Sequence, residues 1–129
     1  MLFETKSEVD IHEMSPLALA FVGDAVLELL VRARLVGTTR LQPNRLHTVA
    51  THYVSAHAQN RELELIEPML TDAEAAVLRR GKNASKATVA KHATVQEYRA
   101  STGFECLLGW LYLNGQLSRV HELFETLWQ

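Results

Sequence analysis

Cysteine is almost absent from this chain of 129 residues, because Cys106 stands alone. A single cysteine cannot form an internal disulfide bond, and without a cysteine pair a structural zinc site is not expected. Cys106 lies inside an apolar run, where a packed, reduced thiol is the expected state. The sequence therefore predicts neither a disulfide framework nor cysteine-based catalysis.

Long hydrophobic runs and linker segments are also missing. No apolar run approaches the roughly 18 residues that a transmembrane helix needs. The acidic start, MLFETKSEVD, lacks the apolar stretch of a secretory or transit signal. No repeat, low-complexity tract or Pro/Gly/Ser-rich linker divides the chain. We therefore expect one domain over residues 1–129, without a membrane anchor, in the cytoplasm, or in the plastid stroma if the source is a plant.

Several common catalytic motifs are absent as well. The chain has no GxSxG elbow of a serine hydrolase and no GxxxxGK[ST] phosphate loop. His47, His52 and His57 are spaced by five residues, so on a helix each side chain turns by about 140° from the one before it. These histidines are therefore not expected to converge on one metal ion.

The sequence does contain a succession of helix signals. Ser15 and Pro16 form a helix start, and the apolar pattern that follows runs to Val36, where Gly37 is expected to end the helix. Similar signals predict further helices from Pro43, from Ser55 to Pro68, from a capping box at 71–74 to Gly81, from Val95 to Leu113, and from Leu117 to Trp128. Residues 82–94 lack apolar periodicity and predict a basic loop. No alternating strand is evident, so the expected fold is all-α, in one compact helical bundle.

Charge is distributed unevenly along the chain. The net charge of −2 argues by itself against a dedicated polyanion-binding protein. Between Arg79 and Arg99, however, six basic residues and one acid give a net charge of +5, which leaves −7 on the rest. This asymmetry predicts a local anion-binding face on an otherwise acidic protein.

Two carboxylates stand in otherwise apolar helices. Asp24 lies in PLALAFVGDAVLELLV, and Glu105 lies in FECLLGWLYL. Helices that are apolar nearly all round are expected to be central, where a carboxylate must meet a cation, a metal or a cleft. Gly23 and Gly103 precede the two acids closely, which predicts that two helix backbones approach and bring the carboxylates together.

Two interpretations of this pair remain open. Each acid can pair with an arginine, such as Arg32 or Arg99, or point into water. Alternatively, the two acids together with the basic segment predict a divalent metal such as Mg²⁺ beside a bound phosphate, because Mg²⁺ prefers oxygen ligands. Glu28 lies one turn after Asp24 on the same helix face, where it can join the site, but its favoured role is to pair with a basic neighbour such as Arg32.

These segments resemble a known family. ALAFVGDAVLE at 18–28 resembles the signature helix of the ribonuclease III family, and FECLLGWLYL at 104–113 resembles its second catalytic helix. With VSAHAQ at 54–59, LRRGKNA at 78–84 and VQEYRASTGFE at 95–105, the chain is similar to the short Mini-ribonuclease III branch, which has no double-stranded-RNA-binding domain. The resemblance covers nearly the whole chain.

The resemblance implies a ribonuclease III-like endonuclease that cuts double-stranded RNA as a homodimer, each subunit cutting one strand, and that matures the 23S ribosomal RNA precursor. The key acids of the family carry over onto Asp24 and Glu105, as catalytic residues and Mg²⁺ ligands, and Phe21 becomes a dimer-interface candidate. Larger relatives carry further acids at the positions of Ala20 and Thr102, so we expect one weakly bound Mg²⁺ per subunit.

The basic segment is the expected RNA surface. The candidates are Arg79, Arg80, Lys82, Asn83, Lys86, Lys91, Tyr98 and Arg99. Duplex RNA is favoured over single strands, because Tyr98 is the only aromatic residue in the segment and single-strand binding needs stacking rings. Taken singly, each lysine can be a solvated charge, Asn83 can end a helical turn, and Tyr98 and Arg99 can serve helix packing. Without a separate binding domain, a ribosomal protein context is a reasonable expectation.

Two rival functions remain open from the sequence. One is a non-catalytic RNA-binding or ribosome-associated module on the same fold, although the presence of both Asp24 and Glu105 argues against it. The other is a helical protein-interaction module whose apolar faces dimerise.

Overall fold

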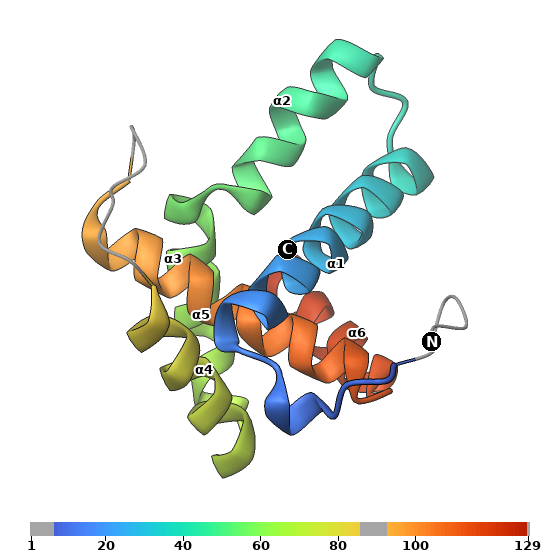
Figure 1. The fold of residues 1–129 in the computed structure, drawn as a ribbon. Coiled ribbons are helices and arrows are strands. Elements are labelled where there is room, and N and C mark those ends of the chain that lie inside the picture. Colours follow the sequence, from blue (N-terminus) through green and yellow to red (C-terminus); the bar gives the residue numbers. More distant parts are fainter. Residues whose placement is uncertain (1–6, 86–92, 129) are drawn as a thin grey trace.

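The computed structural model describes residues 7–85 and 93–128, which form helices joined by short connections (Figure 1). The elements are the 3-10 turn η1 (Ile11–Glu13), α1 (Pro16–Thr38), α2 (Pro43–Val54), α3 (Ala56–Ile66), the 3-10 turn η2 (Glu67–Met69), α4 (Asp72–Ala84), α5 (Val95–Leu113) and α6 (Leu117–Leu127). These ranges contain no strand, and the all-α prediction is confirmed. None of their helices is both long and apolar enough to span a membrane.

The helices begin where the capping signals predict. Ser15 and Ser55 accept hydrogen bonds from the backbone N–H groups three residues later, at the starts of α1 and α3. The predicted capping box opens α4, at Thr71 and Glu74, and a second, unpredicted box at Thr94 and Glu97 opens α5. In each box the hydroxyl and the carboxylate satisfy backbone donors that have no partner within the helix.

Two predicted helix ends are wrong. α4 does not end at Gly81 but continues to Ala84, so Lys82 and Asn83 are helical rather than part of a loop. A Cβ on Gly81 would lie 2.7 Å from the Cβ of Cys106 and 2.8 Å from the Cα of Gly103. The glycine therefore serves the packing of α4 on α5 and not helix termination. Similarly, α1 continues through Gly37 to Thr38.

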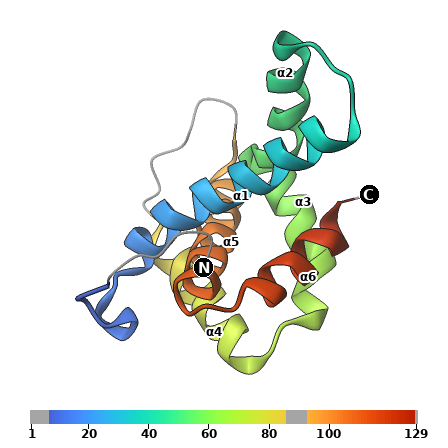
Figure 2. The ribbon, with the colours of Figure 1, turned by 90° about the vertical axis from the view of Figure 1, so that its right-hand side faces the viewer.

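Helix α5 forms the centre of the molecule. It packs against α1, α3, α4 and α6, which surround it in Figures 1 and 2. Its apolar side chains meet those of the surrounding helices in one large core, whose fully buried members include Leu27, Val31, Leu63, Ile66, Phe104, Leu107, Leu108, Leu111 and Leu123. Burial of these side chains from water is the main stabilising contribution to this arrangement.

Helix α1 is covered on one face only. Leu27 and Val31 are buried against the core, whereas Phe21 is 83% exposed and Val36 is 67% exposed. The expectation that α1 is central on all sides is therefore wrong for the isolated chain, because no other described helix covers its outer apolar face. Figure 2 shows α1 and α2 extending together beyond the other helices.

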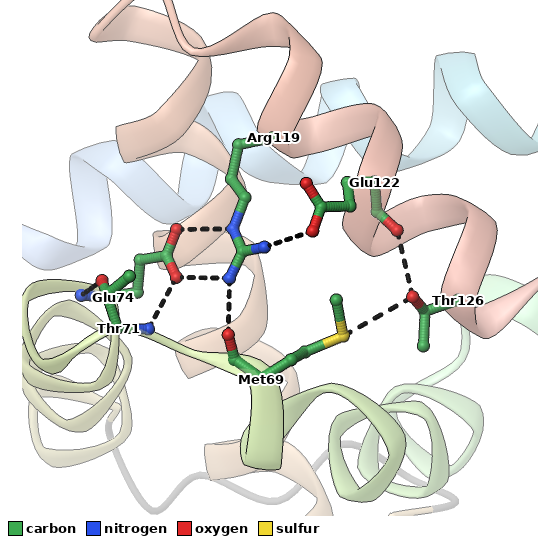
Figure 3. Close-up of polar contacts among 6 residues, drawn as sticks. All are labelled: Met69, Thr71, Glu74, Arg119, Glu122 and Thr126. Atoms are coloured by element: carbon green, nitrogen blue, oxygen red, sulfur yellow. Dashed lines mark hydrogen bonds and ion pairs between the residues drawn. The ribbon is translucent and has the colours of Figure 1, made fainter.

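An ion pair fastens α6 to the start of α4 (Figure 3). Arg119 donates from Nε and Nη2 to the two carboxylate oxygens of Glu74, at 2.8 Å each, and from Nη2 to the carbonyl oxygen of Met69 at 2.6 Å. Glu74 is 3% exposed, and hydrogen bonds from Arg119 lower the pKa of its carboxyl. This buried charge is therefore paired and hydrogen-bonded, as a buried carboxylate requires.

Candidate active site

Two glycines bring the backbones of α1 and α5 into direct contact. A Cβ on Gly23 would lie 1.6 Å from the carbonyl oxygen of Glu105, and a Cβ on Gly109 would lie 1.9 Å from the carbonyl oxygen of Leu19. No side chain larger than hydrogen fits at either position. Because Asp24 follows Gly23 and Glu105 forms the opposite contact, this helix crossing brings the two carboxylates together, as the sequence predicts.

The second glycine of the crossing differs from the predicted one. A Cβ on Gly103 would lie 2.7 Å from the Cγ of Lys82 and 2.9 Å from the carbonyl oxygen of Leu78, so Gly103 faces α4. Gly109, six residues further along α5, takes the role at α1. On a helix, six residues correspond to a rotation of about 240°, which places the two glycines on different faces.

The protonation of Glu105 reflects its crowded surroundings. Burial, together with the nearby carboxylates of Asp24 and Glu28, raises the pKa of Glu105 to about 7, although a hydrogen bond from Gln59 lowers it. Asp24 itself is exposed at the surface. The site therefore holds an exposed acid beside a half-buried one, and an added cation would stabilise the charged forms of both.

A buried glutamine holds Glu105 from the side of α3. Gln59 is 1% exposed, and its Nε2 donates to Oε2 of Glu105 at 3.0 Å and to the carbonyl oxygen of Val54 at 2.9 Å. Gln59 is the last residue of the VSAHAQ segment, and membership of this segment was the only sequence signal for Gln59. The role of Gln59 becomes visible only through its contact with Glu105.

Arginines do not neutralise the two acids in the described parts of the chain. Arg32 instead donates from Nε to Oε2 of Glu28 at 3.0 Å, which confirms the predicted pair. No ion pair to Asp24 or Glu105 exists within residues 7–85 and 93–128. The same ranges contain no cluster of three or more His, Cys, Asp or Glu side chains suited to a metal ion. A metal bound here would take few protein ligands.

Three of the predicted RNA-binding residues line one groove between α3, α4 and α5. Lys82, Asn83 and Arg99 lie along this groove, which has a volume of about 560 Å³. Glu64 and Glu67 line it too, and Lys82 Nζ lies 3.6 Å from Oε1 of Glu67. The groove is therefore of mixed charge, and Lys82 already has an anionic neighbour.

The other predicted RNA-binding residues are dispersed. Arg79 is exposed on α4, while Arg80 lines a separate small pocket with Leu19 and Trp110. Tyr98 is half-buried in α5. Lys86 and Lys91 lie outside the described residues. The described basic residues of the segment thus face at least two different parts of the surface.

An exposed apolar area lies on the outer side of α1. Phe21, Leu17 and Leu29 are exposed there. Beside Leu29 a groove of about 460 Å³ runs between α1 and the α5–α6 region, and its lining includes Val26 and Val120. An apolar area of this kind on a folded domain is typical of a protein–protein contact.

Comparison with known proteins assigns this fold and these motifs to one family. Residues 17–116 match the Ribonuclease III domain family. The chain is also 47% identical over 116 residues to the Mini-ribonuclease 3 of Enterococcus faecalis, a match that covers 88% of each protein. The chain belongs to the ribonuclease III family, in its Mini-ribonuclease 3 branch. The predicted family is thereby confirmed.

Other ribonuclease III relatives and one solved structure agree. The Mini-ribonuclease 3 of Brevibacillus brevis is 42% identical over 111 residues, covering 86% of this chain and 83% of that protein. A crystal structure of a Fusobacterium nucleatum protein superimposes with a TM-score of 0.83 at 28% identity, covering 90% of this chain and 93% of the other. The chain is therefore an endoribonuclease of ribonuclease III type, from a family that acts on double-stranded RNA and is typically dimeric.

Ala20 and Thr102, where the family resemblance predicts further acids in larger relatives, are buried here. Each is 7% exposed. The hydroxyl of Thr102 is engaged with the carbonyl oxygen of Tyr98 at 3.1 Å and with the hydroxyl of Ser85 at 3.2 Å. Neither side chain supplies a carboxylate, so the acids at this helix crossing are Asp24 and Glu105, with Glu28 nearby.

Proposed function

We propose that this chain hydrolyses double-stranded RNA at the crossing of α1 and α5, with Asp24 and Glu105 as catalytic residues and Mg²⁺ as the cofactor. The observation that carries the proposal is the meeting of these two carboxylates, 81 positions apart in the chain, without a described arginine or lysine paired to either. Two ionised carboxylates in one half-buried site repel each other, and either a shared proton or a bound cation relieves the repulsion.

The donor set fits a magnesium ion. Asp24 and Glu105 would hold it through carboxylate oxygens, the ligands Mg²⁺ prefers, and the exposure of Asp24 leaves room for the waters that Mg²⁺ retains. When bound there, Mg²⁺ supplies activation of the attacking water and neutralisation of charge on the phosphate. Gln59 keeps Oε2 of Glu105 in place by its hydrogen bond.

Removing either carboxylate tests the proposal. We expect Asp24→Asn and Glu105→Gln each to slow cleavage of a double-stranded RNA by about 100-fold or more, a loss typical of removing one group that stabilises the transition state. Chelation by EDTA should abolish cleavage by the unaltered protein. Cleavage products on denaturing gels give the rates, while circular dichroism and sedimentation velocity check fold and assembly.

The matched control is Glu13→Gln, which removes an exposed carboxylate in η1, away from the crossing. It should cleave at the unaltered rate. Unchanged cleavage by both Asp24→Asn and Glu105→Gln would eliminate the site, and cleavage that persists in EDTA would eliminate the metal.

The groove beside α4 is the proposed contact with the RNA backbone. Lys82 and Arg99 carry the charges, and the amide of Asn83 can donate to a phosphate or a 2′-hydroxyl. Lys82 would exchange its contact with Glu67 for a phosphate when RNA binds. Arg79, Arg80, Lys86, Lys91 and Tyr98 remain candidates for further contacts with a duplex.

Salt dependence tests this surface. In a Glu105→Gln background that prevents cleavage, we expect Lys82→Ala and Arg99→Ala each to weaken duplex binding. Each should also reduce the slope of log affinity against log salt by about 1, the loss of one phosphate contact. Arg45→Ala on α2 removes an exposed arginine outside the groove and should leave the slope unchanged. An unaltered slope in both groove variants would place the RNA elsewhere.

Dimerisation and the cellular substrate extend the proposal. The exposed Phe21 and its apolar surroundings on α1 support a homodimer in which this face is covered by a second copy. The resemblance to Mini-ribonuclease III supports the 23S ribosomal RNA precursor as substrate, in the cytoplasm and with ribosomal proteins as possible context. The whole of residues 1–129 would act as one ribonuclease III-like domain.

A further inference from the structure

Behind Glu105, helix α3 buries more polar atoms than it satisfies. Gln59 is 1% exposed and Glu62 is 7% exposed. Oε1 of Gln59 and both carboxyl oxygens of Glu62 have no hydrogen-bond partner among the described residues. Each buried acceptor without a donor costs about 1–3 kcal/mol. Three such acceptors on one helix indicate that a hydrogen-bond donor lies among them. An ionised Glu62 cannot be this donor, because a carboxylate has no O–H group.

Glu62 can itself be that donor if it keeps its proton. It follows Gln59 by three residues, so the two side chains lie on the same face of α3. Long side chains on a helix point back toward the preceding turn, which directs the carboxyl of Glu62 over Gln59.

The surroundings of Glu62 favour its neutral form. No lysine, arginine or histidine of the described residues forms an ion pair with it. Burial raises the pKa of Glu62 to about 8, and Arg61, the charged group that acts on it, opposes this only in part. The carboxyl is therefore protonated at neutral pH, with one O–H available as a donor.

The amide of Gln59 must face Glu105 in one orientation. Its Nε2 donates both to Glu105 and to the carbonyl oxygen of Val54, which leaves Oε1 pointing to a different partner. With the amide reversed, Oε1 would face the carboxylate of Glu105 and two acceptors would oppose each other. A donor placed at Oε1 therefore selects the orientation that supports Glu105.

We propose that the uncharged carboxyl of Glu62 donates a hydrogen bond to Oε1 of Gln59 and so holds its Nε2 toward Glu105. Gln59 and Glu62 are then positioning residues for the catalytic pair, and this inference rests on the proposed function. An ionised Glu62 would attract the Nε2 group instead and turn the acceptor of Gln59 toward Glu105.

Two substitutions at one position separate positioning from simple packing. Glu62→Gln retains an N–H donor in place of the O–H, whereas Glu62→Leu fills similar space without a donor. We expect Glu62→Leu and Gln59→Leu to weaken Mn²⁺ binding, measured by calorimetry, by about 10-fold, the lower end of losses seen when a partner of a metal ligand is removed. The same variants should lower kcat on duplex RNA with little change in KM, and Glu62→Gln should stay within about twofold of the unaltered protein.

A readout without metal or RNA keeps the two proposals distinguishable. In NMR spectra of the unaltered protein at pH 6.5, the Glu62 carboxyl carbon should resonate as a protonated acid, and Glu62→Leu should shift the side-chain amide signals of Gln59. An ionised Glu62 in the unaltered protein would overturn the inference even if the leucine variants fail to fold, and so would Gln59 signals that do not change in folded Glu62→Leu. Mn²⁺ affinity in Glu62→Leu equal to that of the unaltered protein would overturn it too. If the unaltered protein binds no Mn²⁺, the proposed function fails, while the spectra still decide the inference.

Discussion

Gly23→Ala is expected to destroy the packing of α1 on α5. The added Cβ would lie 1.6 Å from the carbonyl oxygen of Glu105, 2.5 Å from its carbonyl carbon and 2.9 Å from the backbone nitrogen of Gly109. All three are backbone atoms of a central helix, so no flexible side chain can move aside. Overpacked cores lose about 1–3 kcal/mol and occasionally more. Here we expect a loss of about 4 kcal/mol or more in the free energy of unfolding.

Urea unfolding followed by circular dichroism measures this loss. Gly109→Ala should behave in the same way, because its Cβ would lie 1.9 Å from the carbonyl oxygen of Leu19. Gly37→Ala is the matched control: it lies in the same helix as Gly23, and a Cβ there would meet nothing within 4 Å. It should stabilise the protein by about 0.5–1 kcal/mol through helix propensity. An unfolding midpoint of Gly23→Ala equal to that of the unaltered protein would contradict the close crossing.

Glu62 is expected to make the protein less stable as the pH rises. Its pKa is about 8 in the folded protein, against an ordinary value of 4.5. Below pH 4.5 both the folded and the unfolded chain hold the proton. Between pH 4.5 and 8 the unfolded chain releases it and the folded chain retains it, so unfolding is increasingly favoured. At about 1.4 kcal/mol per pH unit, the loss attributable to Glu62 reaches up to about 5 kcal/mol at pH 8.

Comparison with Glu62→Gln isolates this contribution, because glutamine does not titrate. The free energies of unfolding of the two proteins should differ least near pH 4.5. The variant should become progressively the more stable of the two up to pH 8. Glu105 also has a raised pKa, but it is present in both proteins and cancels from the difference. Parallel stability curves over this range would show that Glu62 is charged or solvated in the folded protein.

The positions of the helices followed largely from local signals. The N-caps at Ser15 and Ser55 and the capping box at Thr71 act within one turn, so each was recognised from four consecutive residues. The capping box at Thr94 was not predicted, although the start of its helix was. Gly81 misled the prediction because a glycine can end a helix or admit a neighbouring backbone. Only the approach of Gly103 and Cys106 from α5 shows which role it has.

The candidate site was predictable only where a residue contrasts with its neighbours in the sequence. Asp24 and Glu105 stood out because charged side chains are rare in apolar helices, and that contrast is visible in the sequence. Gln59 did not stand out, since a glutamine in a polar helix is ordinary until its Nε2 is seen 3.0 Å from Glu105. Glu62 was equally inconspicuous among the other charged residues of α3, because burial against other helices depends on the whole fold.

The sequence by itself determined the all-α class, the starts of the helices, the family and the two acids, because capping, periodicity and motif identity reside in neighbouring residues. The tertiary structure alone decided that Gly109 rather than Gly103 meets α1, that Arg99 borders a groove instead of pairing with Asp24 or Glu105, and that Glu62 is buried without an ion pair to a described cation. Each of these depends on the angle and depth at which distant helices pack, and many side chains set that geometry jointly.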